Sequence, residues 1–246
     1  MFGEKTVVIT GASSGLGAAL ALAFAKRGAN LVLFSRNGEK LREVETVCRE
    51  SGSESLVVIG DVTVPEDCKR LVECSLSHYG SLDYLIANAG VSMWAKFEEV
   101  EDVSIFRRLV ETNYLGAVYC VYYALPHLKK NGGMVVAVSS IQGKIGVPLH
   151  TGYVASKHAL QGFCESLRTE LGGSGVDVLT VLPHWLRGTD LRKNAFGKDG
   201  NLVGPSTRKH SKESVALEDC CQAIIEAIGK RKRELVSLLN SNCCRG

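Results

Sequence analysis

The chain has 246 residues, a net charge of +3 and 45% hydrophobic residues. This is the composition of an ordinary globular protein with one sizeable core, and so small a charge gives no reason to expect nucleic acid as a partner. The longest apolar run, 18–25, is too short to span a bilayer, and the first residues lead directly into a predicted strand, so we expect neither a membrane span nor a signal peptide. The nine cysteines include no Cys-x-x-Cys pair, which predicts no metal site, reduced thiols and a cytoplasmic location.

Short β-branched runs alternate with longer segments of helical apolar spacing along the chain. Strands are predicted over 6–10, 31–34, 56–59, 82–87, 134–138, 176–182 and 234–238. Helices are predicted over 16–27, 38–50, 65–78, 103–128, 152–171 and 213–228. Apolar strands alternating with helices are typical of a parallel sheet covered on both faces. We therefore predict the α/β class: a single doubly wound Rossmann domain over 1–246 with a sheet of about seven strands, and a flexible tail at 240–246.

A long irregular segment, 184–212, follows the predicted strand 176–182 and is rich in glycine. A loop of this length in a compact domain is usually functional, and ligands of open α/β sheets bind beyond the carboxyl ends of the strands. The segment is thus predicted to cover a substrate. Its excess of Lys and Arg fits an anionic substrate, the cofactor phosphates or simply a solvated loop.

A glycine-rich turn joins the first predicted strand to the first predicted helix, with the spacing Gly-x-x-x-Gly-x-Gly over 11–17. Glycines allow a sharp turn and a close approach to a pyrophosphate, and the helix N-terminus offers free N–H groups to it. This spacing differs from the common Gly-x-Gly-x-x-Gly fingerprint and from a Walker loop. The predicted nucleotide-binding residues are Gly11, Ser13, Ser14, Gly15, Leu16 and Gly17.

The end of the second predicted strand reads Ser35-Arg36-Asn37 and lacks the acid that usually binds the ribose of NAD. Arg36 could hold a 2′-phosphate through charge-assisted hydrogen bonds, with Ser35 and Asn37 beside it. This pattern favours NADP(H). The alternative is an exposed arginine at a strand end.

Tyr153 and Lys157 stand four residues apart on a predicted helix and share one face. A nearby ammonium group favours the phenolate and lowers the pKa of a tyrosine, which suits a general acid/base. Such a pair is common by chance, so its meaning depends on the rest of the chain.

The segments 10–17, Asn88-Ala89-Gly90 and 153–157 together resemble the short-chain dehydrogenase/reductase family, in its compact single-domain branch. The resemblance extends from about residue 6 to 238. The segments 111–116 and 139–144 are most similar to the subgroup around 11β-hydroxysteroid dehydrogenases.

The resemblance implies roles for individual residues. Tyr153 matches the catalytic acid/base, and Lys157 the lysine that holds the nicotinamide ribose and lowers the tyrosine pKa. Ser140 matches the serine at the substrate oxygen, and Asn113 the asparagine that positions a water in a proton relay. Further cofactor contacts implied are Asp61, Val62, Asn88, Ala89, Gly90, Pro183, Leu186 and Thr189. The chain departs from the family after Pro183, where the usual glycine is absent and Thr189 is the replacement contact for the carboxamide.

The substrate side of the site is less defined by the sequence. The resemblance places His184 and Trp185 near the nicotinamide and the substrate, although Trp185 could equally pack in its loop. Met93 and Trp94 follow the Asn-Ala-Gly turn and are predicted to wall an apolar pocket, or to be core. The family suggests a lipophilic ketone or alcohol of steroid or retinoid type.

The sequence therefore predicts an NADP(H)-dependent oxidoreductase that transfers hydride between nicotinamide and a carbonyl or secondary alcohol. The resemblance implies a homodimer or homotetramer. The alternatives are a catalytically silent NADP(H)-sensing or scaffold protein of the same fold, which the set of four catalytic-type residues disfavours, and an epimerase or dehydratase, which Arg36 disfavours.

Overall fold

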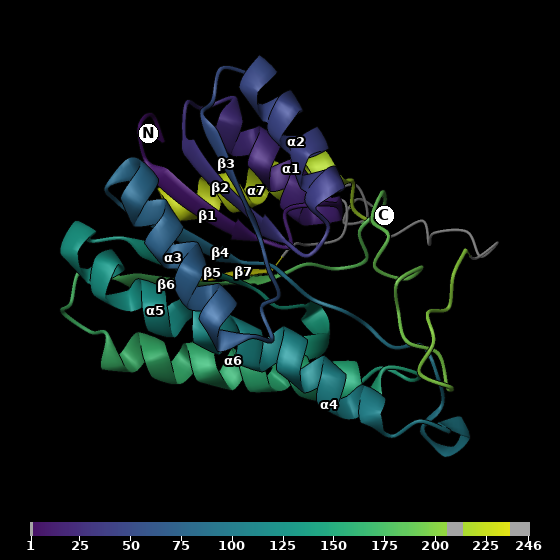
Figure 1. Cartoon of the computed structure of the whole chain (residues 1–246). Helices are drawn as coiled ribbons and strands as arrows, with labels where there is room; N and C mark the ends of the chain where they lie inside the picture. Colours follow the sequence, from purple (N-terminus) through teal and green to yellow (C-terminus); the bar gives the residue numbers. More distant parts are fainter. Residues whose placement is uncertain (1, 206–213, 237–246) are drawn as a thin grey trace, which may run out of the picture.

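A parallel sheet of seven strands forms the centre of the computed structural model, which describes residues 2–205 and 214–236 (Figure 1). The strands are β1 (Thr6–Thr10), β2 (Asn30–Ser35), β3 (Ser55–Ile59), β4 (Tyr84–Ala87), β5 (Met134–Val138), β6 (Asp177–Leu182) and β7 (Glu234–Val236). Their order across the sheet is β3-β2-β1-β4-β5-β6-β7, with parallel pairing throughout. The predicted seven-stranded Rossmann fold is confirmed.

Helices cover both faces of the sheet, as Figure 1 shows. One face carries α1 (Gly15–Ala25), α2 (Gly38–Glu50) and α7 (Leu217–Gly229), and the other carries α3 (Pro65–Tyr79), α5 (Gly116–Asn131) and α6 (Thr151–Glu170). Helix α4 (Ser104–Val110) packs against α6. The central strands are apolar on both sides: Val7 and Ile9 pack beneath α1 and α7, and Val8 packs on the opposite face. Two cores on either side of one sheet explain why these strands read as continuous apolar runs.

The predicted helix over 103–128 differs most from the structure. A single π-helical turn, Glu111–Leu115, separates α4 from α5, and α5 continues to Asn131. It ends where Gly132 takes a left-handed conformation with φ 59°, which glycine adopts without strain. Single π turns within α-helices are frequent at functional sites, and this one contains Asn113.

The strand order reverses at the β1–β4 pair, because β2 and β3 continue on one side of β1 and β5 to β7 on the other side of β4. A crevice opens at such a point beyond the carboxyl ends of the strands. Thr10 and Asn88 join the two strand ends: the Thr10 hydroxyl accepts from the backbone N–H of Asn88 at 3.0 Å, and the Asn88 side chain donates to the Thr10 carbonyl at 2.9 Å. The fold thus positions a binding site between the turns that follow β1 and β4.

The segment after β6 contains no helix or strand over its described part, 184–205. Isolated bridges connect Phe196 to Met93 and to Leu202. The rest of the predicted covering loop, 206–212, and the predicted tail at 240–246 lie outside the described residues. Within the described ranges, none of the helices has the length and apolar content needed to cross a membrane.

Candidate active site

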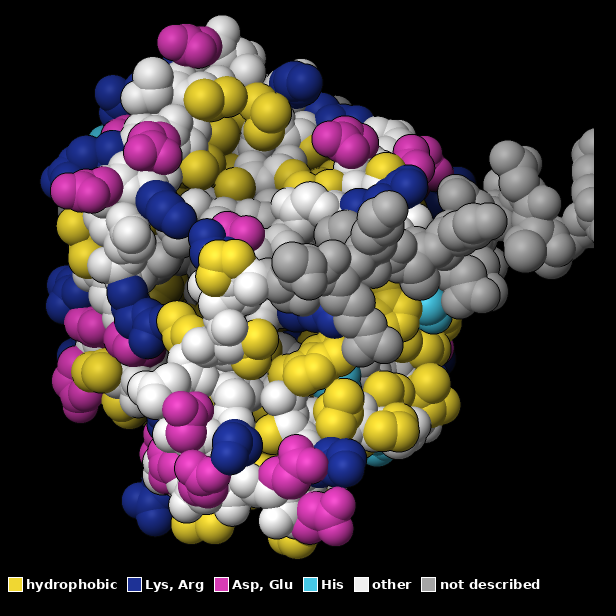
Figure 2. All heavy atoms as spheres, turned by 90° about the vertical axis from the view of Figure 1, so that its right-hand side faces the viewer, with side chains coloured by type: hydrophobic (Ala, Val, Ile, Leu, Met, Phe, Trp, Pro, Cys, Tyr) yellow, Lys and Arg dark blue, Asp and Glu magenta, His cyan; other side chains and the backbone are white. Residues whose placement is uncertain are grey.

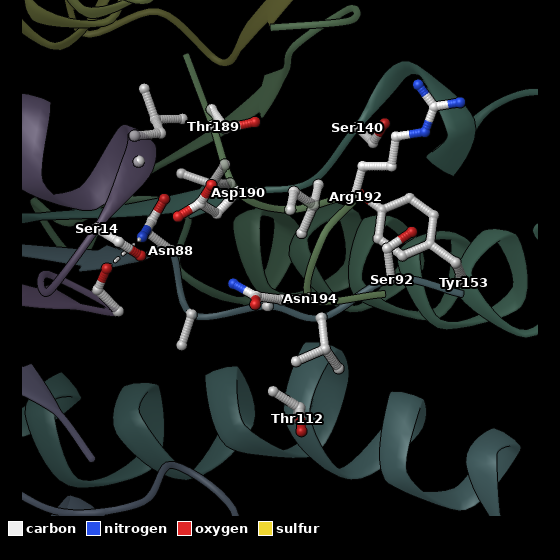
Figure 3. A pocket seen from close by; sticks show the side chains of 18 of the residues that line it. Ser14, Asn88, Ser92, Thr112, Ser140, Tyr153, Thr189, Asp190, Arg192 and Asn194 are labelled. Atoms are coloured by element: carbon white, nitrogen blue, oxygen red, sulfur yellow. Dashed lines mark hydrogen bonds between the residues drawn. The ribbon is translucent and has the colours of Figure 1, made fainter. Parts of the chain in front are cut away.

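One cavity of about 980 Å³ extends along the carboxyl ends of the strands. Figure 3 shows Ser14, Asn88 and Thr189 at one end of it and Ser140, Tyr153 and Arg192 at the other. Figure 2 views the molecule from the side of these loops and shows hydrophobic and histidine side chains gathered on that face. The cavity therefore links the glycine-rich turn to the tyrosine.

Most of the predicted site residues line this cavity. They are Gly11, Ser13, Ser14, Gly15, Leu16, Ser35, Arg36, Asn37, Asp61, Val62, Asn88, Ala89, Gly90, Trp94, Ser140, Tyr153, Lys157, Pro183, His184, Trp185, Leu186 and Thr189. Gly17, Met93 and Asn113 do not line it and lie behind its wall.

The glycine-rich turn is shaped by close backbone contacts. Gly11 has φ 66°, and a Cβ there would lie 2.9 Å from Ala89 Cα; a Cβ on Gly17 would lie 2.2 Å from the Gly11 carbonyl oxygen. Only glycine fits such positions. Helix α1 begins at Gly15, and Ser14 before it makes no capping hydrogen bond within the described residues, so the N–H groups of the first turn face the cavity uncapped.

Arg36 stands at the end of β2 with 72% of its side chain exposed, and its nearest acidic partner is Asp61 after β3, at 3.5 Å. An ion pair this open and this long is weak, which leaves the guanidinium accessible to another anion. Lys40, which the sequence did not single out, lines the same end of the cavity. Asn37 differs from expectation, because its side chain caps α2 by accepting from the Lys40 N–H at 3.0 Å.

Tyr153 and Lys157 lie on α6, one turn apart, and both are buried. Lys157 Nζ donates to the Val138 carbonyl oxygen at 2.8 Å and lies 5.8 Å from the centre of the Tyr153 ring. Ser140 follows β5 and accepts from the Gln142 N–H at 3.2 Å. The neighbouring Ser139 hydroxyl donates to the Lys157 carbonyl at 3.3 Å, which fixes the serine turn against α6.

The pKa shifts of this pair oppose the expectation that the lysine lowers the tyrosine pKa. Burial raises the pKa of Tyr153 to about 12, although its hydrogen bond with Ser140 acts in the opposite direction. Burial likewise lowers the pKa of Lys157 to about 8. Both shifts disfavour the charged form, because each side chain is enclosed by protein. In the protein without ligands, the dominant influence on Tyr153 is desolvation, moderated by Ser140.

Asn113 lies in the π-helical turn and is held on every polar atom of its side chain. Its oxygen accepts from the Val91 N–H at 2.8 Å, and its amide donates to the Val91 carbonyl at 2.8 Å and to the Ser156 hydroxyl at 2.9 Å. Both amide N–H groups are thus used, and the side-chain oxygen keeps one lone pair. The structure places Asn113 as a support that joins the turn after β4 to the tyrosine helix.

Met93 corrects the prediction of an apolar pocket wall. It is fully buried in a small core with Phe196, and its sulfur accepts from the Gly152 N–H at 3.1 Å. Met93 is therefore a core residue and not a substrate contact. The sequence alone cannot distinguish these two roles, because both are filled by apolar side chains.

Several lining residues were not singled out from the sequence, among them His150, Gln142, Arg108 and Phe196. Gln142 lies in a 3-10 turn, Arg108 on α4 and Phe196 in the loop after β6, and no pattern in these segments indicates a ligand contact. His150 stands three residues before Tyr153, and the helical spacing of three to four residues is the one signal that could have indicated it.

The fold and this cavity define a class of protein, the nucleotide-binding α/β proteins whose ligand lies across the point where the strand order reverses. Comparison with known proteins specifies the family: residues 5–200 match the family described as short chain dehydrogenase. The chain belongs to this family of oxidoreductases.

Relatives support the predicted subgroup. The chain is 45% identical over 229 residues to 11-beta-hydroxysteroid dehydrogenase-like 4A of Arabidopsis thaliana, covering 93% of this chain and 74% of that protein. It is 36% identical over 234 residues to 11-beta-hydroxysteroid dehydrogenase 1A of the same organism, covering 93% and 67%. The predicted resemblance to this subgroup is confirmed.

Solved structures share the fold. An alcohol dehydrogenase from the archaeon Thermococcus sibiricus, complexed with 5-hydroxy-NADP, has a TM-score of 0.81 at 24% identity and covers 96% of this chain and 97% of its own. A putative short-chain alcohol dehydrogenase from Sinorhizobium meliloti has a TM-score of 0.72 at 28% identity, covering 76% and 74%.

Proposed function

We propose that this protein is an NADP(H)-dependent oxidoreductase that transfers hydride between nicotinamide and a carbonyl or secondary alcohol, with Tyr153 as the general acid/base. The observation that carries the proposal is the single cavity that joins the glycine-rich turn and Arg36 to Ser140 and Tyr153. Names of relatives as hydroxysteroid dehydrogenases agree with this reaction class.

The residues present fit a dinucleotide. The glycines of this turn leave room for a pyrophosphate at the start of α1, where the Thr189 side chain lies beside Gly15 and lines the cavity. Arg36 and Lys40 are cations at the same end of the cavity, and a 2′-phosphate is their natural partner. The NADP analogue bound by the Thermococcus sibiricus enzyme is consistent with this preference.

NADPH, when bound, supplies the hydride. The Tyr153 phenol then gives its proton to the oxygen that develops negative charge, and the Ser140 hydroxyl donates a hydrogen bond to the same oxygen. The high pKa of Tyr153 keeps the phenol protonated at neutral pH, which suits the direction of reduction. Lys157, one turn away, is available to hold the ribose and to electrostatically stabilise the phenolate that remains.

Aromatic side chains at the reaction end of the cavity suit a lipophilic substrate, such as a steroid, a retinoid or a similar ketone. Trp94, Trp185 and Phe196 line this end. We further propose a homodimer or homotetramer and a cytoplasmic location. The latter is supported by buried thiols that form no disulfide, those of Cys48, Cys68, Cys120, Cys164 and Cys221.

Tyr153→Phe tests the proposal. With NADPH and a panel of ketones, this variant should lose at least ~100-fold of its turnover, the range of general acid/base catalysis, while its affinity for NADPH persists. Tyr122→Phe is the matched control, because Tyr122 is exposed on α5 outside the cavity. Undiminished turnover in Tyr153→Phe would refute the role of Tyr153, and cofactor binding without turnover of any ketone or alcohol would favour a sensor.

A further inference from the structure

His150 is a buried polar side chain that the mechanism above does not use. It directly precedes α6, three residues before Tyr153, and is only 3% exposed, yet it lines the cavity. Its ring makes edge contacts with Trp94 at 4.9 Å, Trp185 at 5.9 Å and Tyr153 at 6.3 Å between ring centres. A single small molecule at the Tyr153 hydroxyl would therefore also reach His150.

The hydrogen bonding of His150 defines which of its nitrogens carries the proton. Nδ1 lies 2.8 Å from the Pro148 carbonyl oxygen, which can only accept, so Nδ1 must be the donor. In the neutral ring, Nε2 is then an acceptor with a free lone pair. Nε2 has no hydrogen-bond partner in the described parts of the chain, and the atom is not fully enclosed by protein. Since His150 lines the cavity, Nε2 is open to it.

The surroundings of His150 keep this lone pair available. Burial lowers the pKa of His150; the Pro148 hydrogen bond raises it, and the charge of Arg192 lowers it again. The Arg192 guanidinium stacks on Trp94, 4.4 Å from the ring centre. The ring is thus neutral at physiological pH. The charged group near it is a cation, Arg192, which disfavours protonation of the imidazole.

Nε2 of His150 is therefore the acceptor that a ligand can reach in this wall. The side-chain oxygen of Gln142 is also unpaired among the described residues, but it is fully enclosed and so not open in the same way. A buried acceptor without a partner is costly unless a ligand satisfies it. An open acceptor beside Tyr153, set among aromatic rings, calls for a ligand that brings a donor.

We infer that Nε2 of His150 accepts a hydrogen bond from a hydroxyl group of the substrate, so that the preferred substrates are hydroxyketones whose hydroxyl stands close to the reacting carbonyl. The inference rests on the proposed function and deepens it by defining the substrate class. A pocket built to pair with a hydroxyl discriminates strongly against an analogue that lacks it, because its own polar groups are then left unpaired.

Three ketones of similar size test the inference: α-hydroxycyclohexanone, α-methoxycyclohexanone, which cannot donate, and cyclohexanone. With NADPH, the wild-type kcat/KM should be at least ~10-fold higher for the hydroxyketone than for either analogue, which is the value of one hydrogen bond to a buried acceptor. His150→Phe keeps a ring but has no nitrogen. In this variant the kcat/KM ratio of hydroxyketone to cyclohexanone should fall to the kcat/KM ratio of methoxyketone to cyclohexanone. His150→Gln, which offers an amide oxygen, should restore part of it.

His158→Phe is the matched control. His158 lies two turns further along α6, and its Nδ1 is likewise bonded to a backbone carbonyl, of Val154 at 2.9 Å, but it is exposed and outside the cavity. Its hydroxyketone preference should equal that of the wild type. A parallel loss for all three ketones in His150→Phe would show that His150 only supports Tyr153, and would overturn the inference.

Ligand binding separates this inference from the proposed function. The chain has two tryptophans, Trp94 and Trp185, and both contact the His150 ring, so tryptophan fluorescence reports on this site alone. With a redox-inactive NADPH analogue, such as the 1,4,5,6-tetrahydronicotinamide derivative, no hydride transfer occurs in either direction. Titration should then give tighter binding of the hydroxyketone than of the methoxyketone in the wild type but not in His150→Phe. This preference without turnover would uphold the hydroxyl site and refute the proposed reaction; its absence would overturn the hydroxyl site whether or not ketones are reduced.

Discussion

The ammonium group of Lys157 lies 5.8 Å from the centre of the Tyr153 ring, and it is bonded to the Val138 carbonyl oxygen rather than to a carboxylate. Both side chains are buried, so each disfavours its own charge before any ligand enters. A cofactor that brings polar groups to Lys157 would remove this penalty. Burial of this pair therefore lowers the stability of the ligand-free protein wherever one of the two side chains is charged, and this loss can be measured.

Burial of Lys157 should make the free energy of unfolding rise with pH in the alkaline range. The pKa of Lys157 falls to about 8 on folding from an ordinary 10.5, so between these values the unfolded chain binds the extra proton. The stability contribution of this group is therefore full above about pH 10.5 and is lost as the pH falls through 8, with a slope of up to ~1.4 kcal/mol per pH unit.

Lys157→Met removes this titration. Urea unfolding of the ligand-free protein at several pH values should give a free-energy difference between variant and wild type that favours the variant most at pH values below about 8. Other buried titrating groups are present in both proteins and cancel in the difference, except for Cys164, whose pKa is lowered by the charge of Lys157 and rises slightly in the variant. A difference independent of pH would contradict a depressed pKa for this lysine.

Gly17 should be intolerant of even one methyl group. A Cβ there would lie 2.2 Å from the Gly11 carbonyl oxygen, which is backbone and cannot move aside. Gly17→Ala should destabilise the protein by ~1–3 kcal/mol or more and weaken NADPH binding through the distorted turn, as measured by thermal unfolding with and without NADPH.

Gly162→Ala is the control for this substitution. Gly162 is exposed within α6, and a Cβ there meets nothing within 4 Å. The change should stabilise the protein by ~0.5–1 kcal/mol, since alanine favours helix over glycine. Equal effects of the two substitutions would show that the Gly11–Gly17 contact is not the limiting one.

The fold could be predicted from the sequence because its signals are local and redundant. Apolar strands such as 134–138 and the glycine turn before α1 follow from backbone sterics and burial alone. The break in the helix around Asn113 could not be predicted, since a π turn has no composition signal and depends here on side-chain bonds to Val91, 22 residues away.

The residues of the candidate site likewise fall into those that local signals predict and those that depend on distant packing. Residues held at strand ends and at the helix start, such as Arg36 and Ser14, were predicted because the sheet topology fixes their place. The sequence left Met93 open between the pocket wall and the core, and His150 was missed, because the direction of a side chain depends on packing between distant segments.

Arg36 should determine the choice between the two nicotinamide dinucleotides. Removing a charge-assisted contact to the 2′-phosphate costs ~1.5–3 kcal/mol, so Arg36→Ala should weaken NADPH ~10–100-fold and leave NADH nearly unchanged. Arg42→Ala, also on the surface near the start of α2 but not lining the cavity, should change neither. Fluorescence titration with both dinucleotides measures this, and an unchanged ratio of affinities would argue against NADP(H) selection by Arg36.

The two directions of the reaction should differ in their pH dependence. Reduction needs the Tyr153 phenol, whose pKa of about 12 keeps it protonated, so kcat/KM for a ketone with NADPH should be nearly constant from about pH 6 to 9. Oxidation needs the phenolate and should rise with pH, approaching ~10-fold per unit while the pH stays below the pKa. Since the Ser140 hydroxyl lowers the pKa of Tyr153, Ser140→Ala should shift the oxidative rise to higher pH as well as reduce its rate. Rates measured in both directions across this range, at saturating cofactor, check this; an oxidative profile that levels near neutral pH in the variant would assign the titration to another group.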